Sequence, residues 1–269
     1  MKLIAAAVQM SSGPDKERNL VTAERLIRAA AQREASVVVL PEVFNWRGPR
    51  SDQAAAAEDL DGPTLTAMAR LARELRLFLV AGSITERIAG QSKAYNTSVL
   101  IGPGGDVLGA YRKIHLFDVE LTGRVSTRES EVKVAGGETV CIPTAVATFG
   151  LSVCYDLRFP ELYRQLAHNG ATVIAIPSAF TYPTGEAHWE VLVRARAIEN
   201  QAFVIAPGQF GRNVHGFSDY GNSMIVDPWG RVLARAPAEG EQVIVAVLDF
   251  DELQRVRREL PALTHRRLF

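Results

Sequence analysis

Residues 150–160 read Gly150-Leu-Ser-Val-Cys154-Tyr-Asp-Leu-Arg158-Phe-Pro160. The apolar residues before Cys154 belong to a run, 145–153, that is typical of a buried strand. Because proline is favoured in the first turn of a helix, the following segment 160–168 is expected to be helical. A strand that passes directly into a helix is the unit from which α/β proteins are built. This stretch therefore predicts a protein of the α/β or α+β class.

Outward from this stretch, strand-like and helix-like segments alternate over most of the chain. The strands are expected at 3–9, 36–40, 77–81, 95–101, 107–112, 145–153, 172–177, 203–207, 222–227, 231–234 and 242–248. The helices are expected at 16–35, 65–75, 160–168, 186–201 and 251–259. Short turns at 102–106 and 228–230 indicate two hairpins. No linker divides the sequence, so residues 1–269 are expected to form one domain of mixed sheet structure covered by helices, with either one sheet or two.

Composition narrows the classes of function. The chain has 269 residues, of which 47% are apolar and 22% are charged. These values are ordinary for a globular protein and argue against disorder. Thirty Lys and Arg residues balance thirty Asp and Glu residues. A protein built to grip nucleic acid or anionic lipid usually carries a basic excess, so neither nucleic acid nor a membrane is expected as a partner.

The cysteines and the long apolar segments bear on the cellular compartment. Cys141 and Cys154 are too few for a disulfide framework or a Cys-rich zinc module, so a reduced, cytoplasmic chain is expected. The uncharged segments 139–155 and 169–185 are interrupted by proline or glycine, and they resemble buried strands more than membrane spans. The apolar run at the N-terminus is too short for a signal peptide.

Familiar catalytic and cofactor motifs are absent from the sequence. There is no His-Glu-x-x-His, no phosphate-binding loop and no Gly-x-Ser-x-Gly elbow, and the five histidines show no ligand spacing. No metal site is therefore expected. Ser130 and Lys133 match a Ser-x-x-Lys pair, but their segment is expected to be an exposed loop, which disfavours a Ser/Lys hydrolase. A Cys/His pair that joins Cys154 to His115 or His188 stays open.

Three reactive side chains stand just beyond the ends of expected strands. Glu42, Lys113 and Cys154 each follow a different strand. Neighbouring strand ends commonly form the rim of an active site in α/β sheets. Cys154 also precedes a helix N-terminus, where a thiolate is favoured, although a buried structural cysteine is the commoner alternative. Together the three side chains are a candidate base, cation and nucleophile.

At these positions the sequence resembles the nitrilase superfamily of carbon–nitrogen hydrolases. The matching segments follow the order of the family along nearly the whole chain: Leu40-Pro-Glu42-Val-Phe44, Tyr111-Arg-Lys113-Ile-His-Leu-Phe117-Asp118, Val153-Cys154-Tyr-Asp-Leu-Arg158-Phe-Pro-Glu161, Ala187-His-Trp-Glu190, Arg194-Ala-Arg-Ala-Ile-Glu-Asn-Gln201 and Ser223-Met-Ile-Val-Asp-Pro-Trp-Gly230. The most similar branch is that of the Nit-type amidases, which act on deaminated glutathione or omega-amides, and the segments 220–230 and 260–267 favour the deaminated-glutathione branch.

The resemblance implies a four-layer α-β-β-α sandwich that assembles as a homodimer or a higher homo-oligomer. It also implies a catalytic triad of Glu42, Lys113 and Cys154, with Glu129 as a second acidic residue. No cofactor is needed, because the triad supplies both the nucleophile and the electrostatic stabilisation. The implied function is an amidase that releases ammonia from a small carboxylated amide through a thioester on Cys154. A nitrilase or an N-carbamoyl amidohydrolase would use the same triad, and a non-catalytic scaffold is the third alternative.

The remaining site residues receive roles from this chemistry. Lys113 and the backbone N–H of Tyr155 would hold the oxyanion that forms when the thiol attacks. Phe180 and Thr181 follow a buried strand and are expected to line the substrate pocket. Arg158 is expected either to meet a carboxylate of the substrate or to pair with a nearby acidic side chain.

Overall fold

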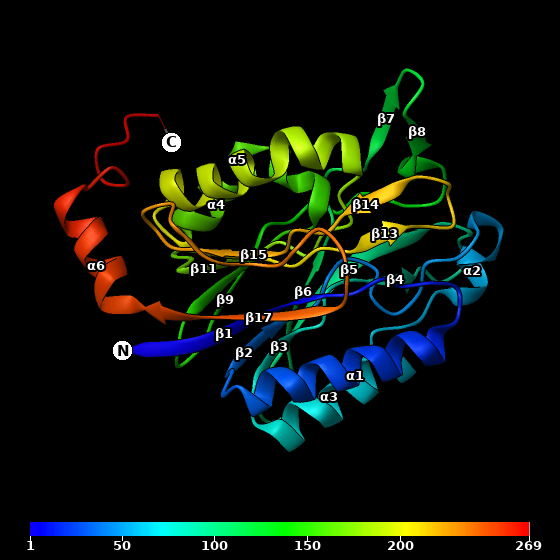
Figure 1. Ribbon diagram of the computed structural model, residues 1–269, viewed down its shortest axis with the longest axis horizontal. Helices are drawn as coiled ribbons and strands as arrows, with labels where there is room; N and C mark the ends of the chain where they lie inside the picture. The colour runs from blue at the N-terminus through cyan, green and yellow to red at the C-terminus, as the bar shows by residue number, and fades with distance from the viewer. Residues whose placement is uncertain (269) are drawn as a thin grey trace.

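Two β-sheets pack face to face at the centre of the protein (Figure 1). The computed structural model describes residues 1–268, and in them the first sheet has the strand order β17-β1-β2-β3-β5-β4, with β6 also paired to β5. Its strands are β1 (Lys2–Gln9), β2 (Val37–Val39), β3 (Phe78–Val80), β4 (Ile84–Arg87), β5 (Ala94–Ile101), β6 (Val107–Arg112) and β17 (Gln242–Asp249). Strands β1, β2 and β3 are parallel, and β6 runs in their direction because it is antiparallel to β5, which is antiparallel to β3.

The second sheet has the order β16-β15-β12-β11-β10-β9. Its strands are β9 (Val140–Pro143), β10 (Thr148–Leu151), β11 (Val173–Ala175), β12 (Phe203–Ala206), β15 (Met224–Val226) and β16 (Val232–Arg235). Strands β10, β11 and β12 are parallel, and antiparallel strands flank them on both sides. Two small hairpins stand apart from the sheets, β7 (Asp118–Leu121) with β8 (Val125–Arg128) and β13 (Phe210–Arg212) with β14 (Ser218–Tyr220).

Helices cover the outer face of each sheet, so the layers follow the order α-β-β-α (Figure 1). The first sheet is covered by α1 (Lys16–Gln32) and α3 (Pro63–Leu75), and the second by α4 (Pro160–His168) and α5 (Tyr182–Asn200). The remaining helical segments are α2 (Gln53–Ala56), α6 (Phe250–Glu259) and the 3₁₀ turns η1 (Arg50–Asp52), η2 (Glu129–Glu131) and η3 (Cys154–Arg158). The expected four-layer sandwich is therefore confirmed.

Side-chain alternation along the strands explains why two helical layers and two sheets form. In β1, Ala5 and Ala7 face the second sheet, whereas Ala6 and Val8 face α1 and α3. Successive side chains of a strand point to opposite faces of its sheet, so a strand that is apolar on both faces must be covered twice. These small and β-branched side chains let the two sheets and the helices approach closely.

The structure corrects several expected boundaries. The helix expected at 186–201 begins at Tyr182, because Pro183 occupies its first turn. Strand β10 covers only part of the segment expected at 145–153. The hairpins at 95–112 and 222–234 are confirmed, whereas the sequence did not predict β4, β9 or the two small hairpins. Among the described residues, no helix has both the length and the apolar character of a membrane span.

Candidate active site

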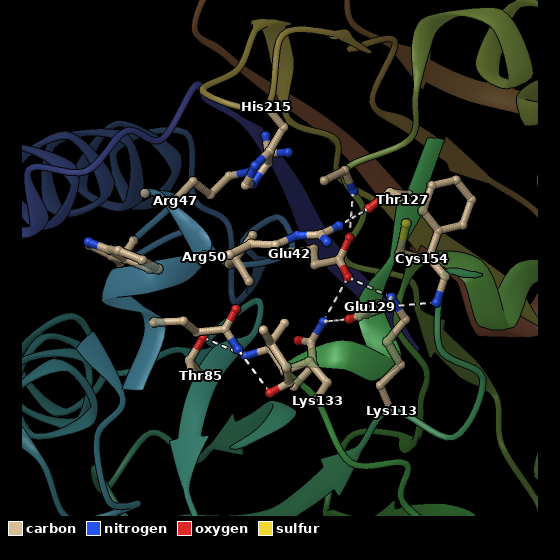
Figure 2. A pocket seen from close by; sticks show the side chains of 18 of the residues that line it. Glu42, Arg47, Arg50, Thr85, Lys113, Thr127, Glu129, Lys133, Cys154 and His215 are labelled. Atoms are coloured by element: carbon tan, nitrogen blue, oxygen red, sulfur yellow. Dashed lines mark hydrogen bonds and ion pairs between the residues drawn. The ribbon is translucent and has the colours of Figure 1, made fainter. Parts of the chain in front are cut away.

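Glu42, Lys113 and Cys154 meet at one edge of the sandwich (Figure 2). Glu42 follows β2 and Lys113 follows β6, and these two strands of the first sheet run in the same direction. Cys154 begins η3, after β10 of the second sheet. The three side chains, which lie far apart in the sequence, line one cavity together with Glu129. Each sheet therefore contributes reactive groups to the same site.

A buried ion-pair network fixes the geometry of the site. Lys113 Nζ lies 2.9 Å from Glu42 Oε1 and 2.8 Å from Glu129 Oε2, and its side chain is only 2% exposed. Asn96 Nδ2 donates to both carboxylates, at 2.9 Å to Glu42 Oε1 and 3.1 Å to Glu129 Oε1. The backbone N–H of Ala179 donates to Glu42 Oε2 at 3.0 Å. The lysine and its two acids are therefore held in one arrangement before any ligand binds.

The charge states of the network follow from these contacts. Burial lowers the pKa of Lys113, but Glu129 and Glu42 raise it more strongly, so the pKa lies well above its ordinary value. Burial raises the pKa of Glu129, but Lys113 and the hydrogen bonds from the Phe117 N–H and Asn96 together outweigh burial, and the pKa falls below its ordinary value. The pair is therefore an ammonium and a carboxylate near neutral pH.

Cys154 occupies a strained turn at the floor of the cavity. Its φ is 50°, in a region that non-glycine residues rarely adopt, and its backbone N–H donates to Pro177 O at 2.9 Å. Val43, directly after Glu42, has a φ of 47° and is β-branched. Burial and the Glu42 carboxylate raise the pKa of the Cys154 thiol, and Lys113 opposes them only in part. Two strained residues beside two titratable groups are typical of a functional site.

The residues expected to bind substrate lie around Cys154. Thr181 lines the cavity, whereas Phe180 is buried beside it and packs against Trp189. Arg158 lies over the rings of Tyr155 and Phe180, at 5.7 and 5.1 Å from their centres. In residues 1–268 no acidic side chain forms an ion pair with Arg158. The expected pairing of Arg158 with a nearby acid is therefore wrong, and Arg158 is not among the residues that line the cavity.

The two histidines considered as partners of Cys154, His115 and His188, do not form a catalytic pair with it, whereas His215, which the sequence did not single out, lines the cavity. His115 Nδ1 lies 2.7 Å from Asp156 Oδ1, and its ring stacks on Phe159. His188 is exposed beside Arg158, at 3.2 Å. Neither histidine lines the cavity that contains the thiol. The Cys/His alternative is therefore not supported by the geometry.

Sequence reasoning missed several residues of the cavity. Asn96 lies within a strand and gave no signal, and Arg47, which pairs with Asp219, was not considered. The Ser130–Lys133 segment was expected to be an exposed loop, and for Lys133 this is wrong, because its side chain is buried and lines the cavity. Ser130 instead donates to Asp118, so no Ser/Lys pair forms. No cluster of three potential metal ligands occurs in the described part of the chain.

Comparison with known proteins places this geometry in a family. The family model of the carbon–nitrogen hydrolases matches residues 4–258. A deaminated glutathione amidase from Bos taurus is 43% identical over 272 residues, which cover 98% of this chain and 82% of that protein. The corresponding amidase from Synechocystis is 41% identical, with 98% of this chain and 97% of that protein covered. Omega-amidase NIT2 from Xenopus tropicalis is 37% identical over 99% of this chain and 95% of that protein.

Solved structures of proteins from the same family are also similar to this chain. The NitFhit protein of C. elegans superposes with a TM-score of 0.92 at 37% identity, and this chain covers 65% of that longer protein. Nit3 of Saccharomyces cerevisiae, from branch 10 of the nitrilase superfamily, has a TM-score of 0.89 at 34% identity, with 99% of this chain and 97% of that one covered. The chain therefore belongs to the carbon–nitrogen hydrolases. Within that family it is an amidase.

Proposed function

We propose that this amidase hydrolyses a small carboxylated amide, of the deaminated glutathione or omega-amide type, with Cys154 as its nucleophile. One observation supports this most directly: the Cys154 thiol shares a cavity with Lys113, which is held between Glu42 and Glu129. A thiol, a carboxylate and an ammonium are the groups that acyl transfer from an amide requires. The relatives are named as amidases, which favours an amide as the substrate over a nitrile or a carbamoyl compound.

The first half of the reaction forms a thioester. Glu42 takes the proton of the Cys154 thiol as the sulfur attacks the amide carbonyl carbon, which removes the need for a free thiolate. The carbonyl oxygen becomes negative and is held by Lys113 and the backbone N–H of Tyr155. One such donor typically contributes about 3–4 kcal/mol to lowering the barrier. Glu42 then gives its proton to the departing nitrogen as the C–N bond breaks.

The second half regenerates the enzyme. Glu42, again ionised, takes a proton from water, and the hydroxide formed attacks the thioester carbonyl. The C–S bond breaks, the acid product leaves and Cys154 recovers its proton. Glu129 keeps Lys113 charged and in place throughout, because it forms a second ion pair with Lys113 Nζ besides that of Glu42.

The acyl half of the substrate is placed on the Cys154 side of the cavity. Thr181 lines that side, Phe180 is buried next to it, and Arg158 lies over the Phe180 ring without lining the cavity itself. Because no acid of the described chain pairs with the Arg158 guanidinium, a carboxylate on the acyl half is its natural partner. This arrangement favours acyl groups that end in a carboxylate.

The proposal also includes that the protein forms a homodimer and works in a reducing compartment. Helix α5 exposes Val191 and Ile198 on one face, Val191 to 68%, and the turn that carries Trp229 lies against Ile198. Exposed apolar side chains that cluster on one helix face are typical of a subunit interface. Cys141 and Cys154 are both free thiols, as expected for a cytoplasmic enzyme.

The experiment is a panel of four substrates. Three share one acyl chain, namely a primary omega-amide, deaminated glutathione and the matching nitrile, and the fourth is an N-carbamoyl amino acid. Because the omega-amide releases ammonia whereas deaminated glutathione releases cysteinylglycine, both amines are quantified along with the acid product. The wild-type protein is expected to turn over the amides, Cys154→Ala to lose all turnover, and the matched control Cys141→Ala to retain it. Turnover of the nitrile alone, or full activity of Cys154→Ala, would overturn the proposal.

A further inference from the structure

Lys133 is a buried cation that the proposed reaction does not use. It follows η2, its side chain is only 5% exposed, and it lines the same cavity as Cys154 (Figure 2). Lys133 Nζ donates to Thr85 Oγ1 at 2.7 Å and lies 3.4 Å from Tyr95 O. Both partners are neutral, so neither balances the charge of the ammonium.

The other buried cations of the described chain have carboxylate partners. Lys113 pairs with Glu42 and Glu129, and Arg47 pairs with Asp219. Lys133 has no carboxylate oxygen within 4.0 Å in residues 1–268. Burial lowers the pKa of Lys133 to about 7, although Glu129 raises it in part. A buried ammonium without a counter-charge is costly, and its position inside a ligand cavity indicates that the ligand brings the missing charge.

The charge of the cavity points the same way. Five side chains that can carry a positive charge line it, and only two carboxylates do: the former are Arg47, Arg50, Lys113, Lys133 and His215, and the latter are Glu42 and Glu129. Arg47 and Arg50 pair with Asp219 and Glu131, which lie outside the lining. Lys113 and Asn96 already bind both acids. The cavity therefore suits an anionic ligand.

The position of Lys133 identifies which half of the substrate meets it. Figure 2 shows Lys133 beside Thr85, across Glu129 from Cys154. The charged groups that act on the pKa of Lys133 are Glu129, Lys113 and Glu42. In the proposed reaction Glu42 protonates the departing nitrogen, and we place the substituent of that nitrogen on the Lys133 side of Glu129, away from the acyl group on Cys154.

We propose that Lys133 binds a carboxylate carried by the leaving amine, so that the preferred amides have an anion on each side of the scissile C–N bond. This inference rests on the proposed function, and it states which of the proposed amide substrates the enzyme prefers. A substrate such as deaminated glutathione, whose leaving dipeptide ends in a carboxylate, satisfies Lys133, whereas a primary omega-amide leaves it without a counter-charge.

The test compares two amides that differ in one group. Deaminated glutathione and its glycine carboxamide share both halves but end in a carboxylate or in a neutral amide. The wild-type kcat/KM is expected to favour the carboxylate by about 10- to 100-fold, the effect of one charge-assisted hydrogen bond. In Lys133→Met the ratio should fall toward one, whereas Lys93→Met, an exposed lysine on the neighbouring segment, should keep the wild-type ratio. Because the two kcat/KM values are compared within each variant, a loss of activity that affects both amides equally does not change their ratio.

A second variant at Lys133 guards against misfolding of the first, and the results that would contradict the proposal are distinct. Lys133→Gln still donates to Thr85 Oγ1 but carries no charge, so it replaces Lys133→Met if that variant does not fold, and it should lose the preference equally. A wild-type ratio near one, or an unchanged ratio in both variants, would overturn the role of Lys133. Turnover of a primary omega-amide but of neither test amide would also overturn the role of Lys133, whereas no turnover of any of the three amides would instead contradict the proposed function itself.

Discussion

At the scale of the residue, the site depends on how the chain distributes charge around Cys154. Burial and Glu42 keep the thiol protonated, whereas Lys113 stays charged because two acids contact it. The sequence allowed the positions of Glu42, Lys113 and Cys154 to be predicted, because each follows a strand. The roles of Asn96 and Lys133 in the cavity could not be predicted. An asparagine inside a strand and a lysine in a polar segment are usually surface residues, and only the tertiary structure shows that these two are buried.

The cost of burying Lys133 gives a prediction about stability. Its pKa of about 7 in the folded protein is lower than its ordinary value of 10.5 in the unfolded chain. Between these values the unfolded chain binds the extra proton, so the free energy of unfolding of the wild-type protein rises with pH. Lys133→Met should therefore be the more stable protein at pH 6, by about 1–3 kcal/mol, and its advantage should shrink at pH 9.

Urea unfolding of both proteins at the two pH values measures this difference. The charged groups that face Lys133 are Glu129, Lys113 and Glu42, and the pKa shifts of Glu129 and Lys113 keep both charged over this range. Lys93→Met is the control, because it makes the same substitution at an exposed lysine. A Lys133→Met protein that is less stable than wild type at pH 6 would show that no burial cost exists.

At the scale of the element, one carboxylate ties the two sheets together behind the site. Asp156 in η3 accepts from the Tyr111 hydroxyl at 2.7 Å, from the His115 backbone N–H at 3.0 Å and from the Val153 N–H at 2.9 Å. Tyr111 belongs to β6 and His115 follows Lys113, whereas Val153 precedes Cys154. Asp156 therefore sets the distance between the lysine and the thiol without touching the substrate.

Asp156→Asn tests this positioning role. The amide keeps the size of the carboxylate but cannot accept at its nitrogen, so Cys154 and Lys113 should lose their alignment. We expect kcat to fall about 10- to 100-fold with little change in KM, because a small misplacement affects the transition state more than ground-state binding. Steady-state kinetics measures both constants, and Glu161→Gln on the exposed face of α4 is the control. A change confined to KM would contradict the positioning role.

At the scale of the whole molecule, alternation in the sequence predicted sheets covered by helices but not the number of sheets. In β1, alanine and valine stand on both faces, so the pattern itself cannot show which face meets a helix and which meets a sheet. The four-layer order came from the resemblance of the motifs, and the structure confirms it. The small hairpins were missed because their strands of three or four residues mix polar and apolar side chains.

The proposed dimer is tested at the same scale. Val191→Glu combined with Ile198→Glu places two charges on the exposed face of α5, which should convert a dimer into monomers because buried charges without partners are costly. Light scattering coupled to size exclusion gives the mass directly. Val21→Glu, on the exposed side of α1, is the control and should leave the mass unchanged. A wild-type protein that elutes as a monomer at micromolar concentration would contradict the dimer.

The nucleophilic role of Cys154 is tested most directly by trapping the acyl group with hydroxylamine. Amides with one acyl half but different leaving amines are hydrolysed in its presence, and the ratio of hydroxamate to acid is measured for each. The ratio should be the same for every amide, because all of them pass through the same thioester on Cys154. A ratio that changes with the leaving amine, or hydrolysis without any hydroxamate, would contradict a common intermediate on Cys154.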